Sequence, residues 1–201
     1  MRKTRIAVLV SGGGTNLQAL IDAQNEGRIP SGDICAVISS RADAYALVRA
    51  ENAGIEGVCI PGKSADFEER LTEALLARSV DMLILAGFMR ILSAEFTAAW
   101  QGRIINIHPA LIPSFCGEGY YGLHVHEAAL RRGVLVTGAT VHYVNEIPDG
   151  GEIILQKAVE VLPGDTAEAL QQRVMREAEW VILPQAAELA AKKIQEETQN
   201  G

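Results

Sequence analysis

Short apolar runs alternate with amphipathic segments along most of the chain, and the two patterns have different periods. The apolar runs contain few polar positions, which is typical of strands buried on both faces of a sheet. We expect these strands at Ile6–Val10, Ile34–Ser39, Val58–Ile60, Met82–Ala86 and Ile104–His108. Segments with a helical period lie between them, and the predicted helices are Asn16–Glu26, Ala44–Ala53 and Asp66–Arg78.

The pattern changes in the second half of the chain. Phe115–Leu123 is rich in Gly and Tyr, has no period and is expected to be a loop. Thr137–Tyr143 and Ile153–Val161 have the pattern of strands. The last segment, Thr166–Gln199, predicts a long helix that Pro184 should break.

Alternation of strands and helices predicts an α/β fold. Repeated βαβ units build a doubly wound, mainly parallel open sheet with helices on both faces, which is a Rossmann-like arrangement. The 201 residues suffice for one well-filled core, and a second core would be cramped. We therefore expect a single domain over residues 1–201.

Composition narrows the possible functions. Hydrophobic residues make up 48% of the chain and charged residues 21%, which excludes a disordered protein. The formal net charge of −7 argues against a nucleic-acid partner, which would need a basic face. No apolar run approaches the ~18–20 residues of a membrane helix, and cysteines without a CxxC pair are typical of a reduced, cytoplasmic protein. Small-molecule substrates are the expected partners, and monomer and homodimer both stay open.

Ser11–Asn16 combines three glycines with the expected start of the first helix. Glycine lets the backbone approach an anion closely, and a helix N-terminus offers unpaired amides and the positive end of its dipole. The segment lacks the Gly-Lys-Ser/Thr of a P-loop, and Leu17 stands where a dinucleotide fingerprint has its third glycine. A monophosphate is the favoured ligand, and a turn that serves backbone geometry alone is the alternative.

Asn106 and His108 lie two residues apart at the end of an expected central strand. Residues at this spacing face the same way, so the amide and the imidazole project together. Open α/β sheets bind their ligands at this end of the strands, and both groups can hydrogen-bond an oxygen that becomes negative in a tetrahedral intermediate. A purely structural histidine is the alternative, and the pairing with Asn106 and the fixed strand exit at Pro109 favour function.

The other polar residues that could be functional are weaker candidates when each is considered alone. Asp149, within Pro148–Gly151, has the pattern of a turn residue, but near His108 its carboxylate would favour the imidazolium and could transfer a proton. His124 and His126 alternate without a third ligand at a metal-binding spacing, so no metal site is expected.

Several segments of the chain resemble the phosphoribosylglycinamide formyltransferases, a branch of the formyl-folate transferase family. The most specific are Leu85–Leu92, Asn106–Pro113, Gly122–His126 and Asp149–Gly151. The Asn-x-His-Pro segment with a downstream Asp is shared by the whole family, whereas the Ser-Gly-Gly-Gly-Thr-Asn loop and the Ala-Gly-Phe-Met-Arg-Ile-Leu run point to this branch. The resemblance implies one formyltransferase domain whose N-terminal half binds phosphate and whose C-terminal half completes the folate and catalytic site.

This resemblance also implies a reaction. The formyl group of 10-formyltetrahydrofolate, the co-substrate, would pass to the amine of glycinamide ribonucleotide in purine biosynthesis, through a tetrahedral intermediate and without a metal. Asn106 and protonated His108 would bind the formyl oxygen. Asp149 would keep His108 protonated and assist the proton transfer from the amine to the departing folate nitrogen.

Binding residues follow from the resemblance in the same way. Gly14, Thr15 and Asn16 would hold the ribose phosphate, and Glu179 would receive the substrate amine. The residues implied for the folate are Met89, Arg90, Ile91, Leu92 and Asn106 along the slot, Asn145, Glu146 and the chain up to Asp149 over the pteridine ring, and Lys63 near the glutamate tail.

Three other functions fit part of the pattern. Methionyl-tRNA formyltransferases share the Asn-x-His-Pro segment but carry a nucleic-acid-binding domain, for which we expect neither the length nor the charge here. Formyltetrahydrofolate hydrolases use water as the acceptor and carry an additional N-terminal regulatory domain, which we also do not expect. A non-catalytic nucleotide-binding module could use the glycine-rich loop, but this function would not explain why Asn106 and His108 project together.

Overall fold

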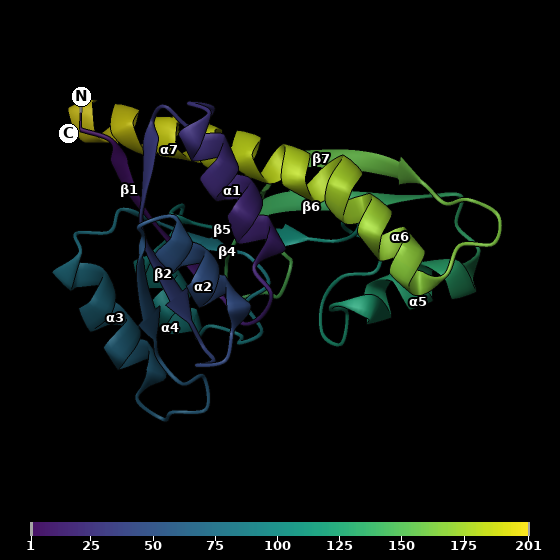
Figure 1. The fold of residues 1–201 in the computed structure, drawn as a ribbon, viewed down its shortest axis with the longest axis horizontal. Coiled ribbons are helices and arrows are strands. Elements are labelled where there is room, and N and C mark those ends of the chain that lie inside the picture. Colours follow the sequence, from purple (N-terminus) through teal and green to yellow (C-terminus); the bar gives the residue numbers. More distant parts are fainter. Residues whose placement is uncertain (1, 201) are drawn as a thin grey trace.

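Seven strands form one sheet in the computed structural model, which describes residues 2–200 (Figure 1). The strands lie in the order β3-β2-β1-β4-β5-β6-β7. Their bounds are β1 Thr4–Val10, β2 Gly32–Ser39, β3 Glu56–Cys59, β4 Met82–Leu85, β5 Ile104–His108, β6 Val136–Tyr143 and β7 Ile153–Glu160. The first five strands pair in parallel, whereas β6 pairs antiparallel with both β5 and β7. The expected mainly parallel, doubly wound sheet is confirmed.

Helices cover both faces of this sheet (Figure 1). They are α1 Thr15–Asn25, α2 Tyr45–Asn52, α3 Phe67–Ala77, α4 Ala94–Ala99, α5 Leu123–Arg132, α6 Ala167–Val174 and α7 Trp180–Asn200. Apolar residues of α1, α2 and α7 share one buried cluster with one face of β1, and those of α3 and α4 share a second cluster with the other face. The strands are apolar on both faces because both faces are covered.

The order of the strands determines where a ligand can bind. Sequence order reverses between β1 and β4, and open sheets of this kind hold ligands beside the carboxyl ends of the strands at such a switch point. The loops that follow β1, β4 and β5 therefore emerge side by side at one edge. A hydrogen bond of 2.9 Å from the Met89 amide to Ser11 Oγ joins the first two loops there.

Most predicted elements agree with the structure, and one prediction is wrong. The five expected parallel strands begin and end within two residues of the observed bounds, whereas α4 and α5 were not predicted. Pro184 does not break the last helix, because it lies inside α7. The irregularity is a π-helical turn at Met175–Glu179, just before the Trp180 carbonyl that the ring of Pro184 would meet in a regular helix. Widening the backbone there lets the helix continue through the proline.

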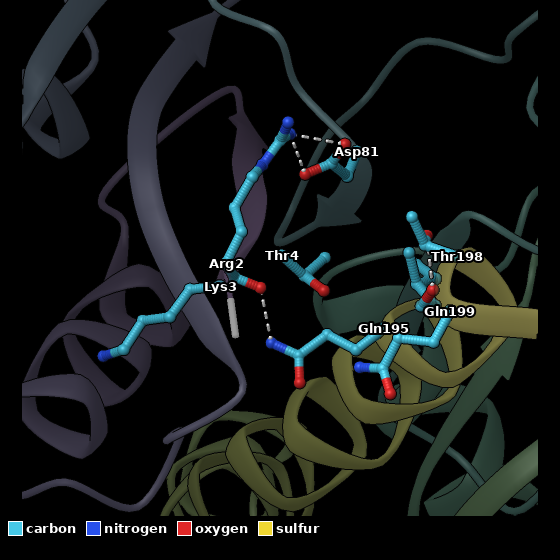
Figure 2. A pocket seen from close by; sticks show the side chains of 8 residues that line it. Arg2, Lys3, Thr4, Asp81, Gln195, Thr198 and Gln199 are labelled. Atoms are coloured by element: carbon cyan, nitrogen blue, oxygen red, sulfur yellow. Dashed lines mark hydrogen bonds and ion pairs between the residues drawn. The ribbon is translucent and has the colours of Figure 1, made fainter.

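The N-terminal segment of the chain contacts the other end of the sheet, where the parallel strands begin. The Arg2 guanidinium binds both carboxylate oxygens of Asp81 at 2.9 and 2.7 Å, and Gln195 Nε2 in α7 donates to the Arg2 carbonyl at 3.0 Å (Figure 2). These groups line a pocket of about 300 Å³ beside Thr4, where β1 begins. The pocket lies at the amino ends of the strands, away from the loops that follow their carboxyl ends. Its contacts tie the N-terminal segment to β4 and α7.

Gly151 fixes the turn before β7 against the end of β6. A Cβ atom at this position would lie 1.8 Å from the Tyr143 carbonyl oxygen, so only glycine fits without a backbone shift. We expect Gly151→Ala to lower the free energy of unfolding by about 1–3 kcal/mol. Gly12→Ala is the matched control, since a Cβ there would meet nothing within 4 Å. Equal stability of the two variants in urea unfolding would contradict the close approach.

Candidate active site

The glycine-rich loop connects β1 to α1 as the sequence predicts. Gly14 is the residue before the helix and has a left-handed backbone, with φ at +71°. Among the described residues, no side chain caps this helix start. The amides of the first turn of α1 therefore face the edge of the sheet and are available to an anion.

Asn16 and Glu179 meet although 163 residues separate them. Asn16 Nδ2 donates to Glu179 Oε2 at 2.6 Å, and the Glu179 side chain is delivered by the π-helical turn before α7. Burial raises the pKa of Glu179 to about 7, against the opposing hydrogen bond from Asn16. The other amide atom of Asn16, Oδ1, is buried and has no partner among the described residues. The residues expected to bind the phosphate and the amine are thus neighbours.

Asn106, His108 and Asp149 also come together. The Asp149 carboxylate lies 3.4 Å from His108 Nδ1 through Oδ2 and 3.5 Å from Asn106 Nδ2 through Oδ1. Asp149 itself has a positive φ of 56°, a left-handed conformation that Asp tolerates better than most residues. The turn at Pro148–Gly151 therefore aims a carboxylate between the two side chains of β5.

Sequence reasoning missed His142. This buried histidine of β6 pairs with Asn106 across the antiparallel ladder. Its Nε2 lies 3.2 Å from Asn106 Nδ2 and 3.4 Å from Asp149 Oδ1, and its Nδ1 donates to the Tyr143 carbonyl at 2.8 Å. Because that carbonyl can only accept, His142 Nδ1 carries a proton, and its Nε2 faces the Asn106 amide and the Asp149 carboxylate. The sequence does show that Thr140 and His142 face the same side of their strand. It does not show that this strand pairs with β5, which is what brings His142 to Asn106.

The loop after β5 supplies two further backbone contacts that the sequence does not reveal. His108 Nε2 donates to the Phe115 carbonyl at 2.8 Å, and the Gly117 amide donates to Asp149 Oδ2 at 2.9 Å. Phe115 adopts a positive φ of 50°, which is unusual for a bulky residue. The predicted loop is therefore tied to the histidine and to the carboxylate.

The electrostatics of this cluster favour an ionised Asp149. Burial opposes its ionisation, but His142, the Gly117 amide and His108 together hold the pKa of Asp149 below its ordinary value. Burial is the largest influence on His108 and lowers its pKa, whereas Asp149 and the Phe115 carbonyl raise it and His142 lowers it. The expectation that Asp149 favours the imidazolium has the right direction, but burial outweighs it in the net pKa.

A slot beside this cluster contains most of the residues implied for the folate. Arg90, Ile91, Leu92, Asn106, Asn145, Glu146, Ile147 and Asp149 all line it. The Arg90 guanidinium donates to the Gly62 carbonyl and lies 4.5 Å over the Phe67 ring. Met89 and Lys63 do not line this slot: Met89 is 58% exposed, and Lys63 lies exposed in the segment that Arg90 contacts.

The described part of the chain contains neither a candidate metal-binding group nor a candidate membrane-spanning helix. Among residues 2–200, no three His, Cys, Asp or Glu side chains gather into a group that could hold a metal ion. None of the described helices is both long enough and apolar enough to cross a membrane.

Comparison with known proteins identifies the family. The family model described as formyl transferase matches residues 4–187. This chain belongs to the formyl transferase family. The resemblance inferred from the sequence is confirmed, since the phosphoribosylglycinamide formyltransferase of Haemophilus influenzae is 43% identical over 90% of this chain and 84% of its own length. The crystal structure of glycinamide ribonucleotide transformylase 1 from Symbiobacterium toebii matches with a TM-score of 0.87 and 46% identity, over 95% of this chain and 89% of that one.

Longer relatives contain the same formyl transferase domain. The human trifunctional purine biosynthetic protein adenosine-3 is 46% identical over the whole of this chain, which spans 20% of that protein. The chain covers between 13% and 20% of the trifunctional relatives from several animals. Formyl transferase domains of this type thus occur both in short proteins and within larger ones.

Replacing Glu179 should remove a pH-dependent loss of stability. Its folded pKa of about 7 lies above the ordinary 4.5. The stabilisation by protonated Glu179 is therefore complete below the lower value and is lost as the pH rises through the higher one. Relative to Glu179→Gln, the free energy of unfolding of the wild type should fall by about 3 kcal/mol between about pH 4 and pH 8. Urea unfolding of both proteins measures this, and a difference that does not vary with pH would contradict it.

Replacing Asp149 should lower the pKa of His108 further. The carboxylate opposes the effect of burial, and Asp149→Asn removes its charge while keeping its size. NMR titration of the His108 ring measures the shift. Asp43→Asn is the control, since this exposed carboxylate pairs with Arg41 instead. An unchanged or raised His108 pKa in Asp149→Asn would refute the coupling.

Proposed function

We propose that this formyl transferase passes the formyl group of 10-formyltetrahydrofolate to the amine of glycinamide ribonucleotide, giving formylglycinamide ribonucleotide in purine biosynthesis. One observation carries the proposal: the glycine-rich loop after β1, the buried carboxyl group of Glu179 and the Asn106–His108–Asp149 cluster lie at the same end of the sheet. The names of the matched relatives give the same substrate.

The acceptor would bind at the start of α1. The amides of Gly14, Thr15 and Asn16 suit a phosphate ester because they add the positive end of a helix dipole to free donors. Glu179, which is bonded to Asn16, would accept a hydrogen bond from the amine of the same substrate. With a pKa of about 7, it can also share a proton with that amine, which must be neutral to attack.

The formyl donor would occupy the slot beside β5. Its apolar walls, Ile91, Leu92 and Ile147, suit a flat ring, and Arg90 with Asn106 supplies polar contacts at the same slot. Lys63 stays our candidate for the glutamate tail, because its segment is held by Arg90 at the rim. Met89 would contact the substrates from outside the slot, through the loop that it joins to Ser11.

Chemistry would take place at Asn106 and His108. The Asn106 amide can donate to the formyl oxygen as it becomes negative. His108 Nε2 already donates to the Phe115 carbonyl, so the imidazolium form would be needed for Nδ1 to donate to a substrate oxygen. Its 3.4 Å separation from Asp149 is longer than a hydrogen bond, so Nδ1 is not committed to the carboxylate. Asp149 would stabilise the imidazolium and relay the proton that the attacking amine loses to the folate nitrogen, whose bond to the formyl carbon breaks as the tetrahedral intermediate collapses.

Removal of either oxygen-binding group should slow the chemical step. We expect Asn106→Ala or His108→Ala to lower kcat by about two to three orders of magnitude with little change in KM, because each donor acts mainly in the transition state. Steady-state assays with glycinamide ribonucleotide measure this. Asn52→Ala, which removes an exposed amide at the end of α2, is the control. A near-normal kcat in either site variant would refute the mechanism.

Substrate dependence separates this function from its alternatives. Absorbance should report loss of 10-formyltetrahydrofolate only after glycinamide ribonucleotide is added. Loss without an amine acceptor would instead indicate a formyltetrahydrofolate hydrolase. No loss under any condition would favour a nucleotide-binding module without catalysis.

A further inference from the structure

Helix α2 contacts the glycine-rich loop through Ala46 in its first turn and Arg49 in its last turn. The Ala46 amide donates to the Gly12 carbonyl at 3.1 Å, and Arg49 Nε donates to the Gly13 carbonyl at 2.8 Å. A Cβ atom on Gly14 would lie only 2.7 Å from the Ala46 side chain. Loop and helix are therefore in direct contact, and the loop cannot move away without losing both hydrogen bonds.

These two bonds determine where the loop amides point. In a trans peptide the carbonyl and the following N–H point in opposite directions. Because the Gly12 and Gly13 carbonyls face α2, the Gly13 and Gly14 N–H groups face away from it. Neither N–H donates to another backbone group within residues 2–200. The loop thus presents consecutive free donors on the side opposite α2, which is the arrangement that binds phosphate oxygens.

Arg49 is fixed more firmly than a surface arginine usually is. Besides the Gly13 contact, its Nη1 donates to Gln18 Oε1 in α1 at 3.0 Å, and its guanidinium lies 5.0 Å over the Tyr45 ring. It forms no ion pair with a carboxylate in the described part of the chain. Arg28 lines the same pocket as Arg49, but it is paired with Glu26 at 2.6 Å. Of these two arginines, only Arg28 is neutralised by an ion pair with a carboxylate, so Arg49 keeps its positive charge behind the loop.

We propose that Arg49 is a positioning residue that orients the Gly13 and Gly14 amides and adds positive charge behind them, so that the loop selects acceptors carrying a phosphate monoester. The proposal rests on the proposed function, in which this loop binds the phosphate of the acceptor. Arg49 acts through the Gly13 carbonyl and needs no contact with the substrate. It would contribute to the recognition of the phosphate and not to the formyl chemistry.

Calorimetry with ribose 5-phosphate tests the proposal without formyl transfer. Arg49→Met should weaken binding of this probe about tenfold or more, as expected for loss of a charged hydrogen bond that organises the site. Arg28→Met removes an equal charge from the same pocket and should change the affinity by no more than about twofold. Arg49→Lys keeps the charge but cannot bind Gly13 and Gln18 together, so its affinity should fall between wild type and Arg49→Met.

Kinetics then separate positioning from a general structural role. In Arg49→Lys, the KM for glycinamide ribonucleotide should rise while kcat and the KM for 10-formyltetrahydrofolate stay near wild type. Equal loss in Arg28→Met, wild-type affinity in Arg49→Lys, or no binding of ribose 5-phosphate by the wild type would each overturn the proposal. If Arg49→Met does not fold, Arg49→Lys decides. Ribose 5-phosphate binding that depends on Arg49 without formyl transfer would sustain this inference and refute the proposed function.

Discussion

The Asp149 carboxylate connects groups that the chain supplies from three separate places. One oxygen faces His108 of β5 and the Gly117 amide, and the other faces His142 of β6 and Asn106. A buried carboxylate without such partners would take up a proton, because a charge is costly to bury. Here the surrounding donors hold the pKa of Asp149 low. The geometry of the oxygen-binding groups therefore depends on one negative charge staying in place.

That charge stays in place because of the fold around it. The antiparallel pairing of β6 with β5 sets His142 opposite Asn106, and Gly151 lets the turn carrying Asp149 approach the end of β6. The parallel strands place the glycine-rich loop at the same edge, two strands away from β5. A mainly parallel sheet thus supplies the binding loops, and its antiparallel extension supplies the groups that order the catalytic cluster.

Local patterns in the sequence were sufficient for some of these features and not for others. Asn106 and His108 could be paired from strand geometry because two residues on one strand face the same way. Asp149, Glu179 and the folate residues came from family resemblance, since nothing local distinguishes them from a turn or a helix residue. His142 and the Phe115 carbonyl were missed because their roles depend on strand pairing and loop closure across the fold. The predicted break at Pro184 was wrong for a related reason. Tertiary packing favours a continuous helix, and a π-helical turn accommodates the proline.

The surroundings of the two acids of the site shift their pKa values in opposite directions. Glu179 has a single amide donor, so burial dominates and raises its pKa to about 7. Asp149 has two histidines and a backbone amide, so these donors outweigh burial and its carboxyl group stays ionised. Environments that separate the pKa values of two acids in this way divide acid and base roles between them. In the proposed reaction this division has a chemical use, because the attacking amine must be neutral beside Glu179, and the proton that it then loses can pass through the ionised Asp149 to the departing folate nitrogen.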